Sequence, residues 1–170
     1  MEPKKARLFV AALPDESTSR KLSEACSRWH RLNVPELRWT SPNQWHVTLA
    51  FLGLADPIEA TRSLAALRTA SCVGRLGPTT TALGKNSLVI PVSGLDRLAA
   101  DVQVATTEIH REGNRVFFGH LTLARSRQQI PARWLGQPLI GDFPVEKVCL
   151  VRSHTLPEGA RYEVLEWWPL

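Results

Sequence analysis

Two short segments with nearly the same sequence place the strongest limit on how this chain can fold. Residues 46–50 (HVTLA) and 120–124 (HLTLA) share four of their five residue types. Polar and apolar residues alternate in both, and a period of two is typical of a β-strand with one face in the core. Since the chain contains only 5 histidines, such a pair arises by chance in roughly one sequence in a hundred at average residue frequencies. We therefore predict two related strands.

The alternation also predicts where the side chains of each segment point. Residues i and i+2 of a strand share a face, so His46 and Thr48 project together while Val47 lies behind them. His120 and Thr122 are arranged in the same way. We expect the two strands to be neighbours, with two imidazoles and two hydroxyls lining one cleft.

Two histidines and two threonines suit an in-line displacement at phosphorus. The attacking and leaving oxygens lie on opposite sides of the phosphorus, so one side needs a base and the other an acid. The imidazole of His46 or of His120, with an ordinary pKa near 6.5, can take either role at neutral pH. Thr48 and Thr122 would donate hydrogen bonds to the non-bridging oxygens, where charge increases in the transition state. This chemistry requires neither a metal nor a cofactor.

Other interpretations of the histidines stay open at this point. A single His-x-Thr segment is usually structural, with its histidine bonded to a backbone carbonyl. A zinc site could combine His46, His120 and a third histidine, because imidazole is a favoured zinc ligand, but the repeated threonine would then be unexplained. The other three histidines fit surface or helix-capping positions better; they are His30, His110 and His154.

Composition limits the remaining function classes. With 170 residues, 44% hydrophobic and 22% charged, residues 1–170 are predicted to form a single two-lobed domain. The apolar runs are far shorter than the ~20 residues of a membrane-spanning helix, and the basic N-terminus does not lead into a secretory signal, so we expect a cytoplasmic protein without membrane contact. Three scattered cysteines indicate reduced thiols. The net charge of +5 favours polyanionic ligands, and a monomer is the default expectation.

Strand and helix signals are mixed along the chain. Strands are predicted at residues 7–13, 37–40, 46–52, 75–83, 87–92, 120–124, 145–152 and 161–167, and helices at 15–32, 56–69 and 95–111, with a helical turn near 131–135. Short turns that contain glycine join the fourth strand to the fifth and the seventh to the eighth, which predicts two hairpins. This mixture predicts an α+β fold with mostly antiparallel sheets and helices packed outside them.

At the two motifs and in several other segments, the sequence resembles the two-histidine phosphoesterase superfamily. Within it, the similarity is to the bacterial RNA 2′,3′-cyclic phosphodiesterases, also called 2′-5′ RNA ligases. The similar segments extend over nearly the whole chain: 7–11 (RLFVA), 13–14 (LP), 37–39 (LRW), 43–53 (NQWHVTLAFLG), 120–125 (HLTLAR), 150–153 (LVRS) and 161–165 (RYEVL). A single His-x-Thr would not be specific, whereas this set is.

The resemblance implies a bilobal α+β fold, in which two mostly antiparallel sheets surround a central groove. It implies hydrolysis of 2′,3′-cyclic phosphates, on RNA ends or nucleosides, to 2′-phosphomonoesters, with slow, reversible 2′-5′ joining of RNA ends. His46 would give a proton to the departing 3′ oxygen, and His120 would be the base that activates water. Thr48 and Thr122 would hold the phosphate. Arg125 would add positive charge beside it, since a guanidinium matches phosphate geometry.

Two positions depart from the pattern of the resemblance. Gly119 stands where relatives often carry proline, which predicts a more mobile backbone before His120. Residues 88–92 (LVIPV) lack the usual aromatic residue and contain a proline, which suits an edge strand or a bulge. Phe51 is a candidate for an aromatic wall against a base, whereas Phe9 is expected in the core.

An RNA-binding module without turnover is the alternative function. Its phosphate contacts would come from five basic residues, Arg38, Lys85, Arg125, Arg127 and Arg152. A binding module has no need for two titrating histidines, however, and this favours the enzyme.

Overall fold

The computed structural model describes residues 4–31, 37–109 and 116–170. Its strands are β1 (Ala6–Ala12), β2 (Leu37–Trp39), β3 (Val47–Ala55), β4 (Cys72–Leu76), β5 (Thr81–Leu83), β6 (Ser87–Ser93), β7 (His120–Ser126), β8 (Gly141–Val145), β9 (Lys147–Leu156) and β10 (Gly159–Pro169). Its helices are α1 (Glu16–His30), α2 (Pro57–Ala65) and α3 (Asp96–Ala105), with the short 3-10 turns η1 (Pro42–Gln44) and η2 (Ala132–Trp134). The predicted α+β class is confirmed.

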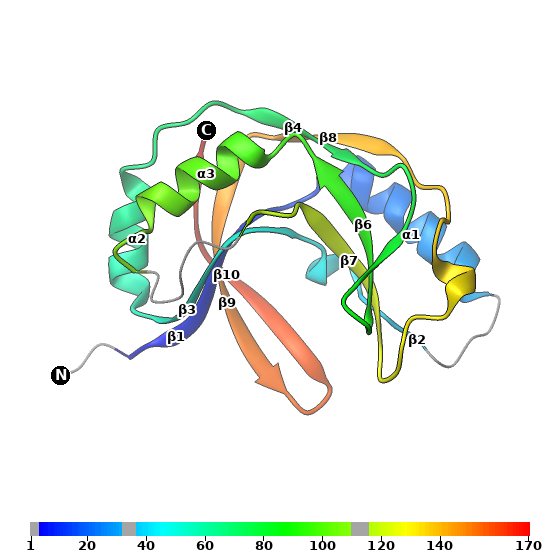
Figure 1. Cartoon of the computed structure of the whole chain (residues 1–170). Coiled ribbons are helices and arrows are strands. Elements are labelled where there is room, and N and C mark those ends of the chain that lie inside the picture. Colours follow the sequence, from blue (N-terminus) through cyan, green and yellow to red (C-terminus); the bar gives the residue numbers. More distant parts are fainter. Residues whose placement is uncertain (1–3, 32–36, 110–115) are drawn as a thin grey trace.

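The strands form one curled, antiparallel arrangement (Figure 1). Their order is β10-β9-β1-β3-β7-β6-β4-β8, with β2 beside β7 and β5 beside β6. The first four belong to one lobe and the others to the second. Only one residue pair, Val47 with Leu121, joins β3 to β7 in the described part of the chain. The two expected sheets therefore meet at the two motif strands.

The helices cover the outside of the sheets and are exchanged between the lobes. α1 follows β1 in the chain, yet Thr18 Oγ1 donates to the Asp142 carbonyl of β8 at 3.3 Å. α3 precedes β7, yet Gln103 Nε2 donates to the Leu49 carbonyl of β3 at 3.4 Å. Figure 1 shows α2 and α3 over one half of the molecule and α1 over the other. Each lobe is thus covered in part by a helix that follows a strand of the other lobe.

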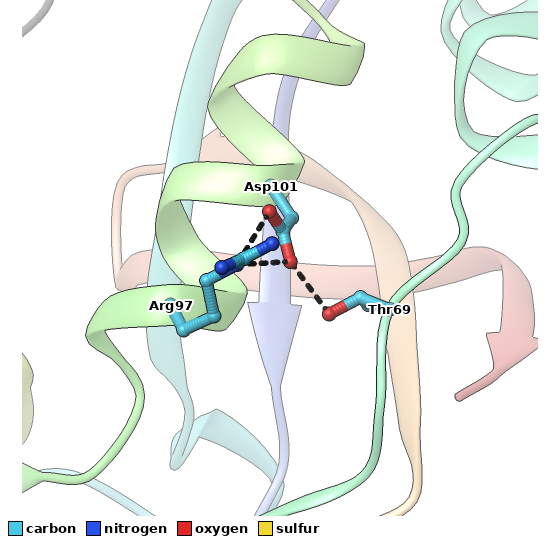
Figure 2. Close-up of polar contacts among 3 residues, drawn as sticks. All are labelled: Thr69, Arg97 and Asp101. Atoms are coloured by element: carbon cyan, nitrogen blue, oxygen red, sulfur yellow. Dashed lines mark hydrogen bonds and ion pairs between the residues drawn. The ribbon is translucent and has the colours of Figure 1, made fainter.

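A carboxylate on α3 ties this helix to the segment after α2 (Figure 2). Asp101 accepts a hydrogen bond of 2.7 Å from the hydroxyl of Thr69 and contacts of 3.0 and 3.1 Å from Nε of Arg97, one turn earlier. The hydrogen bond from Thr69, followed by that from Arg97, holds the pKa of Asp101 below its ordinary value. α2 and α3 are thereby linked beside β3.

The core is continuous across both lobes, and the motif strands contribute to it from their apolar faces. Val47, Leu49, Leu121 and Leu123 are all at most 1% exposed and belong to the same cluster. Burying an aliphatic side chain of this size contributes roughly 1.5–3 kcal/mol. The predicted division of each motif into a buried apolar face and a polar face is confirmed.

The helices begin where predicted and end earlier. Asp15 caps α1 by accepting a hydrogen bond of 2.9 Å from the Thr18 amide, and Asp56 caps α2 in the same manner. α2 ends at Ala65 instead of residue 69, and α3 ends at Ala105. The expected end of this last helix, near residue 111, lies outside the described residues.

Residues 75–83 do not form one strand, contrary to prediction. β4 ends at Leu76 and β5 begins at Thr81, because Gly77 adopts a φ of +104° and Pro78 has no amide hydrogen for a ladder. β8 was not predicted at all. Its sequence, GDFPV, has the composition of a turn, and the strand exists because it pairs with β4 at the edge of the sheet.

Pro91 lies inside a central strand, so the expectation of an edge strand is wrong. β6 has β7 on one side and β4 and β5 on the other. The carbonyl of Pro91 accepts a hydrogen bond of 2.9 Å from the Gly77 amide, and the ring nitrogen faces the same side of the strand. The proline therefore occupies the point at which the neighbouring strand is interrupted. The irregularity in the β6 ladder lies earlier, between Leu88 and Val89.

None of the described helices has both the length and the apolar character needed to cross a membrane. The three cysteines are free thiols, two of them buried and Cys72 partly exposed.

Candidate active site

The ladder pair between Val47 of β3 and Leu121 of β7 brings the two motifs together. Because Val47 pairs with Leu121 in an antiparallel sense, His46 lies across from Thr122, and Thr48 lies across from His120. All four polar side chains line one cleft of about 750 Å³. Each histidine therefore faces the threonine of the opposite motif.

Both histidines are held by the same kind of local hydrogen bond. Nδ1 of His46 lies 2.7 Å from the carbonyl of Gln44, and Nδ1 of His120 lies 2.7 Å from the carbonyl of Phe118. A carbonyl only accepts, so Nδ1 carries the hydrogen in both rings. Nε2 of neither ring has a hydrogen-bond partner in the described part of the chain. Each ring is thus left with Nε2 available to exchange a proton with a ligand.

His46 is surrounded by aromatic side chains from other strands. Its ring centroid lies 4.8 Å from that of Phe9 on β1 and 4.9 Å from that of Tyr162 on β10. Burial lowers the pKa of His46 to about 4, the hydrogen bond to Gln44 opposes this shift, and the charges of His120 and Arg125 add to it. In the free protein, His46 is therefore neutral at neutral pH.

The two threonines and Arg125 complete the polar surface of the cleft. Neither Thr48 nor Thr122 uses its hydroxyl in a hydrogen bond among the residues that the structure describes, so both can bind a ligand. Nη1 of Arg125 donates to the hydroxyl of Ser87 at 3.1 Å, and Arg125 lines the cleft. The structure brings all five predicted site residues to one place.

Gly119, at which a more mobile backbone is predicted from the sequence, is packed tightly against β6. A Cβ atom at this position would overlap the carbonyl oxygen of Val92. The Val92 amide donates to the Gly119 carbonyl at 2.8 Å. The missing side chain thus lets β6 approach the residue that precedes His120.

The β9–β10 hairpin forms one wall of the cleft and is held to the opposite lobe. Nη1 of Arg38 donates to the Glu158 carbonyl at 2.8 Å, and Nε2 of Gln44 donates to the Ala160 carbonyl at 2.8 Å. Between these two bonds lies Gly159, where a Cβ atom would come within 2.8 Å of the Arg38 guanidinium. The hairpin brings Tyr162 against His46.

Sequence reasoning missed several residues of the cleft. Tyr162, Gln44, Trp39 and Thr40 line it, although no local pattern marks them. Tyr162, Gln44 and Trp39 lie within segments similar to the family, which was the only available signal for them. Phe9 is 4% exposed, as expected for a core residue, but it also lines the cleft, as does Phe51, which is 60% exposed.

The five basic residues considered for RNA binding fall into separate groups. Arg38 and Arg125 line the cleft, and Arg127 lines a neighbouring cavity. Lys85 lies on neither surface, and Arg152 lies 3.7 Å from Glu163 in an ion pair.

No third histidine joins His46 and His120 in the described part of the chain. His154 Nε2 lies 2.9 Å from Glu163 on the β9–β10 hairpin, His30 ends α1, and His110 lies outside the described residues. Among the described residues, no three His, Cys, Asp or Glu side chains are grouped as metal ligands.

Comparisons with known proteins point to phosphoesterases. The family model LigT like Phosphoesterase matches residues 13–72, which include the first motif, whereas no curated protein sequence matches the chain. Among solved structures, the chain is similar to TT0787 of Thermus thermophilus, with 26% identity, 96% of this chain and 97% of that chain covered, and a TM-score of 0.76.

The chain also shares its fold with E. coli LigT. The structure complexed with 3′-AMP is 23% identical, with 98% of each chain covered and a TM-score of 0.73; the structure complexed with phosphate is 22% identical, with the same coverage and TM-score. The chain is therefore similar to the LigT-like phosphoesterases by sequence over residues 13–72, and it shares their fold over nearly its whole length.

Proposed function

We propose that the protein hydrolyses 2′,3′-cyclic phosphates, on RNA ends or on nucleosides, to 2′-phosphomonoesters. The observation that carries this proposal is the pair of histidines with Nδ1 bonded to a carbonyl and Nε2 free toward one cleft. An acid and a base on either side of one phosphorus are what an in-line displacement needs. If the 5′ hydroxyl of a second RNA end replaced water as the nucleophile, the same groups would join the two ends through a 2′-5′ linkage as the bond from phosphorus to the 3′ oxygen breaks.

In the proposed reaction, Nε2 of His120 takes a proton from water as the water oxygen attacks phosphorus. The bond from phosphorus to the 3′ oxygen breaks, and Nε2 of His46 gives its proton to that oxygen. The product is a 2′-phosphomonoester, and solvent returns the two rings to their starting protonation states. Thr48 and Thr122 donate hydrogen bonds to the non-bridging oxygens, and Arg125 stabilises their charge.

The proton on His46 would be supplied together with the substrate. Burial keeps the pKa of His46 low in the free protein, and the nearby charge of Arg125 adds to this effect. A phosphodiester anion in the cleft offsets that charge and so raises the pKa of His46. This coupling would charge the acid when a substrate is bound.

The complexes of E. coli LigT with 3′-AMP and with phosphate are consistent with a nucleotide-sized anion in this fold. We expect the protein to act in the cytoplasm and as a monomer.

Product analysis tests the proposal directly. The protein is incubated with cytidine 2′,3′-cyclic phosphate in the presence of a metal chelator, and the products are separated. We expect cytidine 2′-phosphate; a 3′-phosphate would contradict the proposed leaving group, and lack of turnover would contradict the activity. Full activity in chelator would also exclude the zinc site.

The same assay separates the enzyme from an RNA-binding module. His46→Ala and His120→Ala should each lower turnover by several orders of magnitude while changing the affinity for RNA only a few-fold. Unaltered turnover in either variant would remove that histidine from the mechanism.

A further inference from the structure

The cleft has two chemically different ends, and the strand register defines them. β3 runs away from His46 toward Phe51 and Leu54, and antiparallel β7 runs in the opposite sense toward Arg125. Leu54 pairs with Arg7 at the first end. The first end therefore offers apolar and aromatic surface beside one arginine.

The second end carries two arginines on neighbouring strands. Arg38 of β2 pairs directly with Arg125 of β7, and antiparallel partners lie roughly 5 Å apart at their Cα atoms. Both guanidiniums line the cleft. The two histidines thus lie between an aromatic end and a cationic end.

A second cavity of about 830 Å³ adjoins the cationic end. It shares Arg38 and Arg125 with the cleft and adds a third arginine and three amides, Arg127, Asn86, Gln128 and Gln129. We call this cavity the arginine groove. Its lining includes no aspartate or glutamate among the described residues, so a bound anion would meet no like charge from them.

The cations of the arginine groove are not committed to carboxylates. Elsewhere the structure pairs Arg97 with Asp101 and Arg152 with Glu163. Arg38 donates to a backbone carbonyl and Arg125 to a serine hydroxyl, and among the described residues Arg127 has no ion pair. Guanidinium groups that are not paired with a carboxylate are suited to phosphate, which they bind through parallel hydrogen bonds.

We propose that the arginine groove binds the nucleotides on the 5′ side of the terminal cyclic phosphate, so that an RNA strand is a better substrate than a mononucleotide. This inference rests on the proposed function. With the cyclic phosphate between His46 and His120, the terminal base would occupy the aromatic end, and the 5′ phosphate would leave past Arg38 and Arg125. Amides beside these cations can bond bases and 2′ hydroxyls of a single strand.

A comparison of two substrates in matched variants tests the groove. The substrates are cytidine 2′,3′-cyclic phosphate and a tetranucleotide that ends in the same cyclic nucleotide. Arg127→Gln removes one charge from the groove, and Arg62→Gln removes one charge from the exposed end of α2. The mononucleotide reports on the cleft alone, because Arg127 does not line the cleft.

We expect the wild-type protein to have a kcat/KM at least tenfold higher for the tetranucleotide. Arg127→Gln should reduce this preference about fivefold or more, and Arg62→Gln should leave it unchanged. The proposed role of the arginine groove would be overturned by equal kcat/KM values for the two substrates in the wild-type protein. It would also be overturned if Arg127→Gln and Arg62→Gln lost the preference for the tetranucleotide equally.

If neither substrate is hydrolysed, the proposed function fails. Binding of an RNA strand then still tests the arginine groove. A fluorescent tetranucleotide with a 2′-phosphate end is titrated by anisotropy at several salt concentrations. Arg127→Gln should bind it more weakly, with a salt slope smaller by about 0.7, the value for one lost phosphate contact on a single strand. The same affinity and slope as the wild-type protein would contradict the groove.

Discussion

The two motif strands have nearly the same sequence, but they place their histidines in different surroundings. His46 lies between Phe9 and Tyr162, both from other strands. The ring of His120 is stacked on that of Phe118, two residues earlier in the chain, with 5.6 Å between their centroids, and Phe118 is itself 48% exposed. A repeated motif therefore repeats the local hydrogen bond of the histidine without repeating its hydration. We expect this difference in burial to give the two histidines different roles, His46 as the acid and His120 as the base.

Removing the imidazole of His46 or of His120 should have the largest effect on turnover. A substrate with a different leaving group should distinguish the roles of the two histidines. We expect His46→Ala and His120→Ala each to lower kcat by about 10³-fold on a cyclic phosphate. A phosphodiester that releases p-nitrophenolate needs no proton from an acid. Its hydrolysis should therefore recover in His46→Ala and stay slow in His120→Ala. Initial rates on both substrates measure this, and the opposite pattern would exchange the two roles.

The next largest effect should come from a side chain placed behind His120. Gly119→Ala would put a Cβ atom against the Val92 carbonyl oxygen, which should cost roughly 1–3 kcal/mol of stability and at least tenfold in kcat by moving His120. Urea unfolding and turnover measure the two losses.

Gly141→Ala is the matched control for that variant. The nearest atom to a Cβ there lies 3.7 Å away, in ordinary contact, so both quantities should stay near their wild-type values. Equal effects of the two substitutions would remove the special role of Gly119.

The buried ring of His46 should make stability depend on pH. An unfolded chain binds a proton at this histidine near pH 6.5, whereas burial, aided by nearby charge, lowers the pKa in the folded protein to about 4. Between these values the unfolded state binds more protons, so stability falls as the pH falls from 6.5 to 4. The loss is at most roughly 3 kcal/mol, and solvent contact of the partly exposed ring reduces it.

His46→Gln removes the titrating group and should flatten that dependence. Urea unfolding curves at pH 7, 5.5 and 4.5 for the two proteins give the comparison. If the variant lost stability with falling pH as steeply as the wild-type protein, the ring of His46 would not be the group responsible.

A smaller effect is expected from opening the aromatic wall of His46. Tyr162→Leu should admit water, raise the pKa of His46 toward 6.5 and change the rate several-fold, while Tyr162→Phe keeps the ring and should leave the pKa unchanged. NMR titration of the imidazole measures the shift. An unchanged pKa in the leucine variant would mean that burial by Tyr162 does not keep His46 neutral.

Local patterns were sufficient for the elements with strong periodicity or caps. The motif strands, the start of α1 at the Asp15 cap and the hairpin of β9 and β10 are where they were predicted. β8 was missed because an edge strand needs only one partner and its sequence contains turn residues. The break between β4 and β5 was missed because apolar and β-branched residues continue on both sides of Gly77.

The sequence alone determined the polar and apolar faces of both motifs, because the two-residue period of a strand is a property of neighbouring positions. Only the tertiary structure decided what surrounds those faces. Tyr162 reaches His46 across more than a hundred residues of chain, and Arg38 meets Arg125 through the pairing of β2 with β7. Such contacts depend on register and strand order, which arise from the packing of the whole core.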